Sequence, residues 1–127
     1  MPSPAFALRL FGDVSLRHEA GPVEGRASQA RRLAFLALLG TQGRSLSRSK
    51  ILGYLWPDMA ESRGRHLLSD TMYVVRSSLG DDALLTVGES VELNPERVWV
   101  DVRAYESALK DGRYREAVEL YRNPFLD

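Results

Sequence analysis

The 127-residue sequence contains no cysteine, which excludes disulfide bonds and thiol catalysis and fits a cytoplasmic protein. No apolar run approaches the roughly 18 residues that a membrane-spanning helix requires, so no membrane partner is predicted. The first residues, MPSPAFALRLFG, contain no basic leader followed by a long apolar stretch, so we expect no secretory signal. With 44% apolar residues, a chain of this length can bury the core of one ordinary globular unit.

Catalytic and cofactor motifs are equally scarce. The two histidines, His18 and His66, lie in different expected elements, and no ligand spacing is typical of a metal site. The glycines form neither a dinucleotide-binding pattern nor a phosphate loop. His66, Ser69 and Asp70 share a helix face, but neighbours on one exposed helix lack a pocket and oxyanion donors. The sequence therefore predicts a protein that is not an enzyme, with no cofactor and no metal.

Net charge is also absent, because 17 basic residues balance 17 acidic ones, but the two signs are unevenly distributed. Residues 26–78 contain nine arginines and lysines against three acidic residues, a local charge of +6. Residues 79–127 contain six against eleven, a local charge of −5. A basic middle segment in a neutral chain is a candidate anion-binding surface, and accidental clustering on a solvated surface is the alternative.

Apolar periodicity predicts the first elements of the chain. Residues 6–10 and 14–17 alternate between apolar and other side chains on either side of Gly12-Asp13, which predicts a pair of strands. The segment SQARRLAFLALLGTQG is apolar around most of its circumference, which predicts a buried helix. Ser28 is its expected N-cap, and Gly43 lies near its expected end.

Two further helices are expected in close succession. Ser47 can cap a second helix that ends at Trp56, because Pro57 disfavours helical geometry in the residue before it. Asp58 and Glu61 then have the spacing of a capping box, so we expect a third helix to begin at once.

The third helix, Glu61–Leu79, is predicted to be amphipathic and to end at Gly80. At about 100° per residue, its aliphatic residues share one side and its charged residues from Arg65 onward share the other. The side expected to be buried comprises Gly64, Leu67, Leu68, Thr71, Met72, Val74, Val75, Ser78 and Leu79. After it, LLTVGESVEL alternates around Gly88-Glu89, which predicts a hairpin, and residues 98–100 are expected to add a short extended piece.

This order of elements is the layout of a winged helix, an α+β fold with a small N-terminal antiparallel sheet, three helices and a C-terminal wing hairpin. The tight connection at residues 56–58 orients the third helix across the second and presents its outer side to a DNA groove. Base contacts in the major groove are expected from Arg65, Ser69, Asp70, Tyr73, Arg76 and Ser77. Phosphate contacts are expected from Arg44, Arg48, Lys50 and Arg63.

Several stretches together resemble a known family. LRLFGDVSL, ARRLAFLALLGTQGRSLSRSKILGYLWPD, SSLGDDALL, VWVDVRAYESAL and LYRNPFLD are similar to the Streptomyces antibiotic regulatory proteins. The resemblance covers nearly the whole chain and implies an OmpR-type winged helix over residues 1–100. It implies the start of a bacterial transcriptional activator domain over residues 101–127. Double-stranded promoter DNA with direct repeats is the partner that it implies, and RNA polymerase is a further candidate.

Residues 101–127 are expected to form one helical hairpin. Residues 101–111 and 113–122 each carry an apolar face, and Gly112 makes the turn between them. Because one helix pair of a repeat array seldom stands alone, the hairpin should fold back on the winged helix, or the chain is a fragment of a longer regulator. We favour the fragment, and the sequence leaves open whether the protein pairs on DNA.

A winged helix that contacts a protein is the alternative function. The third helix is poor in arginine, because Ser69, Asp70 and Ser77 occupy outer positions, and this favours a protein partner. Glu89 at the tip of the hairpin favours it too, since a carboxylate is repelled by DNA phosphates. A third hypothesis, a helical adaptor built on the C-terminal pair, has less support because the basic charge lies elsewhere.

Overall fold

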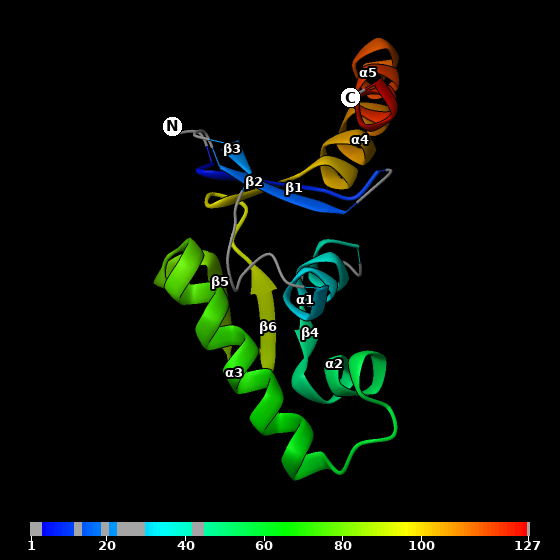
Figure 1. Ribbon diagram of the computed structural model, residues 1–127. Coiled ribbons are helices and arrows are strands. Elements are labelled where there is room, and N and C mark those ends of the chain that lie inside the picture. Colours follow the sequence, from blue (N-terminus) through cyan, green and yellow to red (C-terminus); the bar gives the residue numbers. More distant parts are fainter. Residues whose placement is uncertain (1–3, 12–13, 19–20, 23–29, 42–44, 127) are drawn as a thin grey trace.

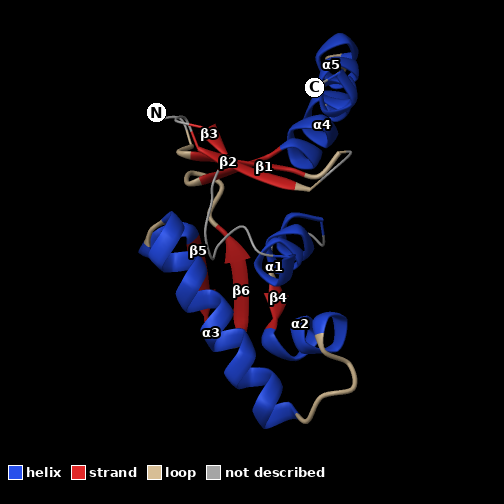
Figure 2. Ribbon diagram, in the orientation of Figure 1, coloured by secondary structure: helices blue, strands red, loops and turns tan. Residues whose placement is uncertain are grey.

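A computed structural model describes residues 4–11, 14–18, 21–22, 30–41 and 45–126 of the chain (Figure 1). Over these residues the fold is α+β, with helices and two small sheets, as predicted (Figure 2). The helices are α1 (Ala30–Thr41), α2 (Arg48–Leu55), α3 (Glu61–Leu79), α4 (Asp101–Lys110) and α5 (Tyr114–Leu126), with a 3₁₀ turn η2 (Asp81–Ala83). The strands are β1 (Phe6–Arg9), β2 (Ser15–His18), β3 (Gly21–Pro22), β4 (Leu46–Ser47), β5 (Leu84–Val87), β6 (Ser90–Leu93) and β7 (Val98–Val100).

The first sheet joins the start of the chain to the segment just before α4. Its strand order is β3-β2-β1-β7, with β1 antiparallel to β2 and parallel to β7. The predicted strand pair is confirmed, and the extended piece at residues 98–100 is confirmed as β7. What the sequence did not predict is that β7 pairs with β1, with Leu8 opposite Val100.

The second sheet contains the predicted hairpin. Strands β5 and β6 pair antiparallel around Gly88 and Glu89, and β4 pairs with the other edge of β6. Gly88 has a φ of 57°, in the left-handed region that a side chain disfavours, so glycine suits this turn. Strand β4 places Ser47, the residue before α2, beside Ser90 at the base of the turn.

Helix α1 lies between the two sheets and forms the centre of the core (Figure 1). Its residues Phe35, Leu36 and Leu39 are buried, as are Leu8 of the first sheet and Val91 of the second. All five belong to one hydrophobic cluster. The buried helix that the sequence predicted is therefore confirmed as α1, whereas Ser28 and Gly43 lie outside the described residues.

Helix α3 has the predicted bounds and ends at Gly80, whose φ is 110°. Most of the predicted inner side is buried, but Leu67 is half-buried and Ser78 is exposed. The buried stripe is therefore narrower than the half-circle that the helical angle alone predicts. A narrower stripe leaves a wider outer side available to a partner.

The predicted capping box is wrong. Ala60 is the N-cap of α3 and makes no side-chain cap hydrogen bond, so Asp58 does not cap the helix. Met59 and Ala60 extend the turn before the helix begins, with Met59 N donating to Trp56 O at 3.2 Å. A capping box would make Glu61 the third residue of the helix, but it is the first. Its carboxylate accepts a hydrogen bond from Arg65 Nε instead.

The cap at the start of α2 is confirmed. Lys50 N donates to Ser47 Oγ at 3.2 Å, which satisfies one of the backbone donors that a helix start leaves free. The helix ends one residue earlier than expected, at Leu55, and Trp56 is its C-cap.

The predicted helical hairpin is confirmed as α4 and α5, with Gly112 at a φ of 78° in the turn. Helix α4 packs on α1, β1 and β7. Its first residue, Asp101, is 1% exposed, and its carboxylate accepts hydrogen bonds from Leu10 N at 2.8 Å and Phe11 N at 3.2 Å. Arg103 donates to the carbonyls of Leu39 and Gly40 near the end of α1, so α4 is fastened to both the first sheet and α1. No helix in the described ranges has the length and apolar character needed to cross a membrane.

Candidate nucleic-acid interface

The outer side of α3 presents a polar surface beside the β5–β6 hairpin. Ser69, Tyr73 and Ser77 are exposed, and the Tyr73 side chain is the most open of the three at 68%. Arg65 and Arg76 are half-buried and lie along the edge that faces the hairpin. The side chains predicted to meet DNA therefore form a central exposed row with two arginines on one flank.

Five of the ten predicted contact residues line one hollow. This hollow has a volume of about 270 Å³ and lies between α3, the start of α2 and the turn η2. It is lined by Arg48, Ser69, Met72, Tyr73, Arg76, Ser77 and Asp81. Two arginines, two hydroxyls and an exposed phenol in one place supply donors, acceptors and a flat ring to a single partner. Met72 and Asp81 were not predicted, because Met72 falls among the aliphatic residues and Asp81 follows the helix.

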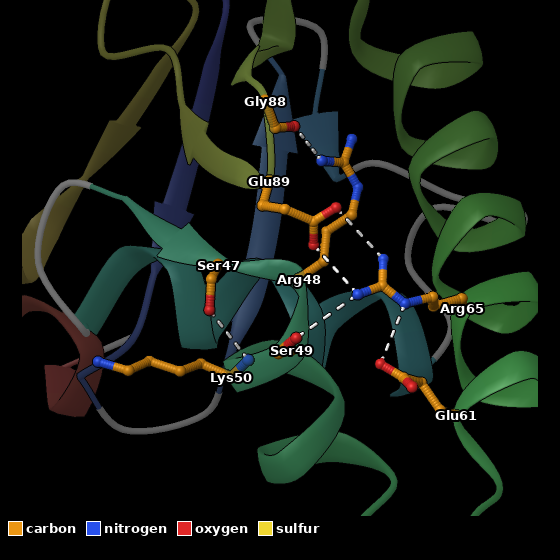
Figure 3. A network of polar contacts seen from close by, with 8 residues as sticks. All are labelled: Ser47, Arg48, Ser49, Lys50, Glu61, Arg65, Gly88 and Glu89. Atoms are coloured by element: carbon orange, nitrogen blue, oxygen red, sulfur yellow. Dashed lines mark hydrogen bonds and ion pairs between the residues drawn. The ribbon is translucent and has the colours of Figure 1, made fainter.

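The tip of the hairpin is fastened to the first turns of α2 and α3 (Figure 3). Arg48 donates through Nη1 to Gly88 O at 2.6 Å and through its backbone N to Glu89 O at 2.9 Å. Arg65 donates to both carboxylate oxygens of Glu89, at 3.1 and 3.4 Å. It also donates to Glu61 at 3.4 Å. The hairpin position relative to α3 is thus set by hydrogen bonds across three elements.

These contacts alter the electrostatics of the hairpin tip. The hydrogen bond from Arg65 is the main reason that the pKa of Glu89 lies below its usual value, and the charges of Arg65 and Arg48 act in the same direction. The same hydrogen bond raises the pKa of Arg65 above its usual value. Because two arginines surround the one carboxylate of Glu89, the tip does not present an isolated negative charge. The sequence predicted an acidic tip that repels phosphate, and the structure pairs that acid with cations.

Asp70 lies at the opposite edge of the outer side. Its carboxylate is 3.5 Å from Arg32 Nη2 of α1, and the Arg32 side chain is almost fully buried. Asp70 is therefore directed toward α1, and neither it nor Arg65 lines the hollow that Ser69, Tyr73, Arg76 and Ser77 line. Arg76 has an internal partner as well, since its Nη2 donates to Leu84 O at 3.2 Å.

The predicted phosphate-contacting residues are distributed around the starts of α2 and α3. Arg48 and Lys50 lie in the first turn of α2, where the Lys50 side chain points away from Arg65 (Figure 3). Arg63 is exposed in the first turn of α3. Arg44 lies outside the described residues. Ser49, which the sequence did not single out, accepts a long hydrogen bond from Arg65 at 3.5 Å, and only its place between Arg48 and Lys50 hinted at this.

No protein-family model matches the chain, and no curated protein matches it.

Proposed function

We propose that this chain is a sequence-specific DNA-binding module of a bacterial transcriptional activator, and not an enzyme. In this proposal the fold is an OmpR-type winged helix, α3 is the recognition helix in the major groove and the β5–β6 hairpin is the wing. The partner is double-stranded promoter DNA. The observation that carries the proposal is the hollow in which Arg48, Ser69, Tyr73, Arg76 and Ser77 meet on the outer side of α3.

The shape of α3 supports docking in a groove. Its outer side carries polar residues along the helix, and a major groove about 12 Å wide admits one α-helix. Arg65 and Arg76 are eleven residues apart, roughly 16 Å along the helix axis at about 1.5 Å per residue. In this docking, Arg65 in the first turns of α3 reaches base edges, while Arg76 beside the hairpin lies near the phosphate backbone of the DNA.

Charge near the helix starts supports the same proposal. Lys50 and Arg63 are exposed, and neither forms an ion pair with another residue in the part of the chain that the structure describes. Unpaired cations attract phosphate without selecting a base, which fixes how the helix sits on the duplex. Arg48, at the first position of α2, adds a third cation to this group.

The test is a selection from random duplexes, because the target sequence is unknown. The folded parent should enrich a motif, and Tyr73→Ala should weaken binding to that motif while its circular dichroism spectrum stays unchanged. Tyr114→Ala is the matched control, because Tyr114 is an equally open tyrosine, 65% exposed, but lies on α5. Enrichment that is equal for both variants and the parent would contradict a recognition role for the outer side of α3.

A protein partner for the same surface is the second candidate. The observation that favours it is that Arg65 and Arg76 already donate to Glu89 and Leu84, so fewer donors are free for bases than the sequence suggests. A folded protein that binds no duplex even at low salt would select this candidate.

A further inference from the structure

The first sheet holds a second hollow, which contains both apolar and basic side chains and is remote from α3. Along β1 the side chains alternate, so Phe6 and Leu8 point into the core while Ala7 and Arg9 lie on the other face. Ala7 is opposite Arg17 of β2 on one side and Trp99 of β7 on the other. A small side chain thus lies between a guanidinium and an indole.

This arrangement forms a hollow of about 350 Å³. Arg9, Arg17, His18 and Trp99 contribute to its lining, and no acidic residue lines it among the described residues. His18 is itself held by a tilted contact with Phe6, with ring centroids 5.0 Å apart. The lining therefore combines positive charge with flat aromatic surface.

Within the part of the chain that the structure describes, the two arginines of the hollow have few protein acceptors. Arg9 Nε is buried and has no hydrogen-bond partner among the residues that the structure describes. Arg17 is exposed and forms no ion pair with any residue in the described ranges. Buried donors are almost always satisfied, and Arg9 also lines the open hollow, so an acceptor that enters the hollow can reach the guanidinium group. Guanidinium groups favour carboxylate and phosphate oxygens, which accept paired hydrogen bonds.

We propose that this hollow binds a small ligand made of one flat aromatic ring and one anionic group. Trp99 offers a face on which the ring stacks, and Arg9 and Arg17 offer donors to the anion. The volume lies at the lower end of the range of about 300–1,000 Å³ for small-molecule sites. Among the described residues, the hollow shares none with the hollow on α3, so the proposal does not depend on DNA binding.

Tryptophan fluorescence provides a direct test. The chain has two tryptophans, Trp56 and Trp99, so Trp56→Phe leaves Trp99 as the only reporter. Adenosine monophosphate and benzoate each combine a ring with an anion, one a phosphate and the other a carboxylate. At least one of them should change the Trp99 emission saturably. The compound that does so shows whether the hollow binds a phosphate or a carboxylate. Adenosine and inorganic phosphate, which each lack one half of the ligand, should bind about tenfold more weakly or worse.

Variants separate binding in the hollow from binding elsewhere. Arg17→Gln should weaken the effective ligand about tenfold, and it is expected to fold normally because Arg17 is exposed. Arg9→Gln should do the same, with its fold checked by a thermal melt. Arg115→Gln is the matched control, since Arg115 is an exposed arginine on α5. The proposal is overturned if neither ring-bearing anion binds at millimolar concentration, if phosphate alone binds as well, or if Arg17→Gln binds like the parent.

Discussion

At the scale of single residues, the most informative side chain is Arg65. It is half-buried between Glu61 and Glu89 and donates to both carboxylates. An exposed ion pair of this kind contributes little stability, because solvent screens it, so the pairing does not prevent Arg65 from turning to a base. Arg76 differs, since it donates to a backbone carbonyl at the edge of the hairpin. The two arginines should therefore respond differently to truncation.

Arg65→Ala should lower the preference for cognate over scrambled duplex, by about 1–3 kcal/mol if it reads a guanine through paired contacts. Arg76→Ala should weaken both duplexes about equally, because its place near the far end of α3 suits a phosphate. Competition binding at fixed salt measures both effects. If Arg65→Ala lost equal affinity for both duplexes, Arg65 would not contact a base.

Asp70→Asn should act mainly on stability. The substitution removes the negative charge beside Arg32, whose side chain is nearly buried, and weakening one of the interactions of a buried cation is destabilising. We expect a loss of about 0.5–2 kcal/mol in the free energy of unfolding, since Asp70 itself is partly exposed to solvent. Urea unfolding measures it, with Asp81→Asn as a control on an acid for which the structure shows no ion pair within the described residues. An unchanged unfolding midpoint, together with tighter binding to scrambled duplex, would show instead that Asp70 acts by repelling phosphate.

At the scale of elements, the starts of α2 and α3 are built differently. Ser47 caps α2 with its hydroxyl, whereas α3 begins after Ala60 with no side-chain cap. Met59 and Ala60, the two residues before Glu61, belong to the turn and not to the helix, so they separate Asp58 from the helix start. Sequence spacing alone cannot fix such a start, because one or two extra turn residues leave the apolar pattern of the helix intact.

Ser47→Ala and Asp58→Ala form a matched pair that tests these starts. Ser47→Ala should lower the free energy of unfolding by about 0.5–2 kcal/mol, because Lys50 N loses its acceptor. Asp58→Ala should leave the thermal melt unchanged, since Asp58 is exposed and does not cap α3. Equal destabilisation by the two substitutions would mean that Asp58 does cap the helix.

At the scale of the whole molecule, cations and acids are separated along the chain. The basic segment, residues 26–78, contains α1, α2 and nearly all of α3, and the acidic segment contains the β5–β6 hairpin and the helical hairpin. Figure 1 shows α4 and α5 on the far side of the first sheet from α2 and the start of α3. These helices are nearly neutral, because residues 101–127 contain six acidic residues against five basic ones, and most of the negative charge lies in residues 79–100, with five acidic residues against one basic.

Duplex binding should therefore weaken steeply with salt. The four cations proposed to contact phosphate, Arg44, Arg48, Lys50 and Arg63, predict a log–log slope of about −3 to −4 per protomer. Lys50→Gln should reduce the slope by about 0.9, while Lys110→Gln on α4 should leave it unchanged. Fluorescence anisotropy at a series of salt concentrations measures both. A slope near zero in the parent would contradict phosphate contact.

Local patterns in the sequence determined the elements and most of the proposed contact surface. Helical periodicity predicted the buried side of α3, Gly80 predicted its end, alternation predicted the hairpin, and Ser47 predicted the start of α2, because each depends on residues a few positions apart. The outer position of Ser69 and Tyr73 followed from the same periodicity.

The tertiary structure alone decided which charges are paired and which strands meet. Arg65 lies 24 residues from Glu89, and the Asp101 carboxylate binds a backbone amide 91 residues away at Leu10. Strand β7 likewise joins β1 across nearly the whole chain. No spacing rule links residues so far apart, because they become neighbours only in the folded chain, where both sheets pack on α1 in one core. The sequence therefore determined where the cations are, and the fold determined which of them remain free to bind a partner.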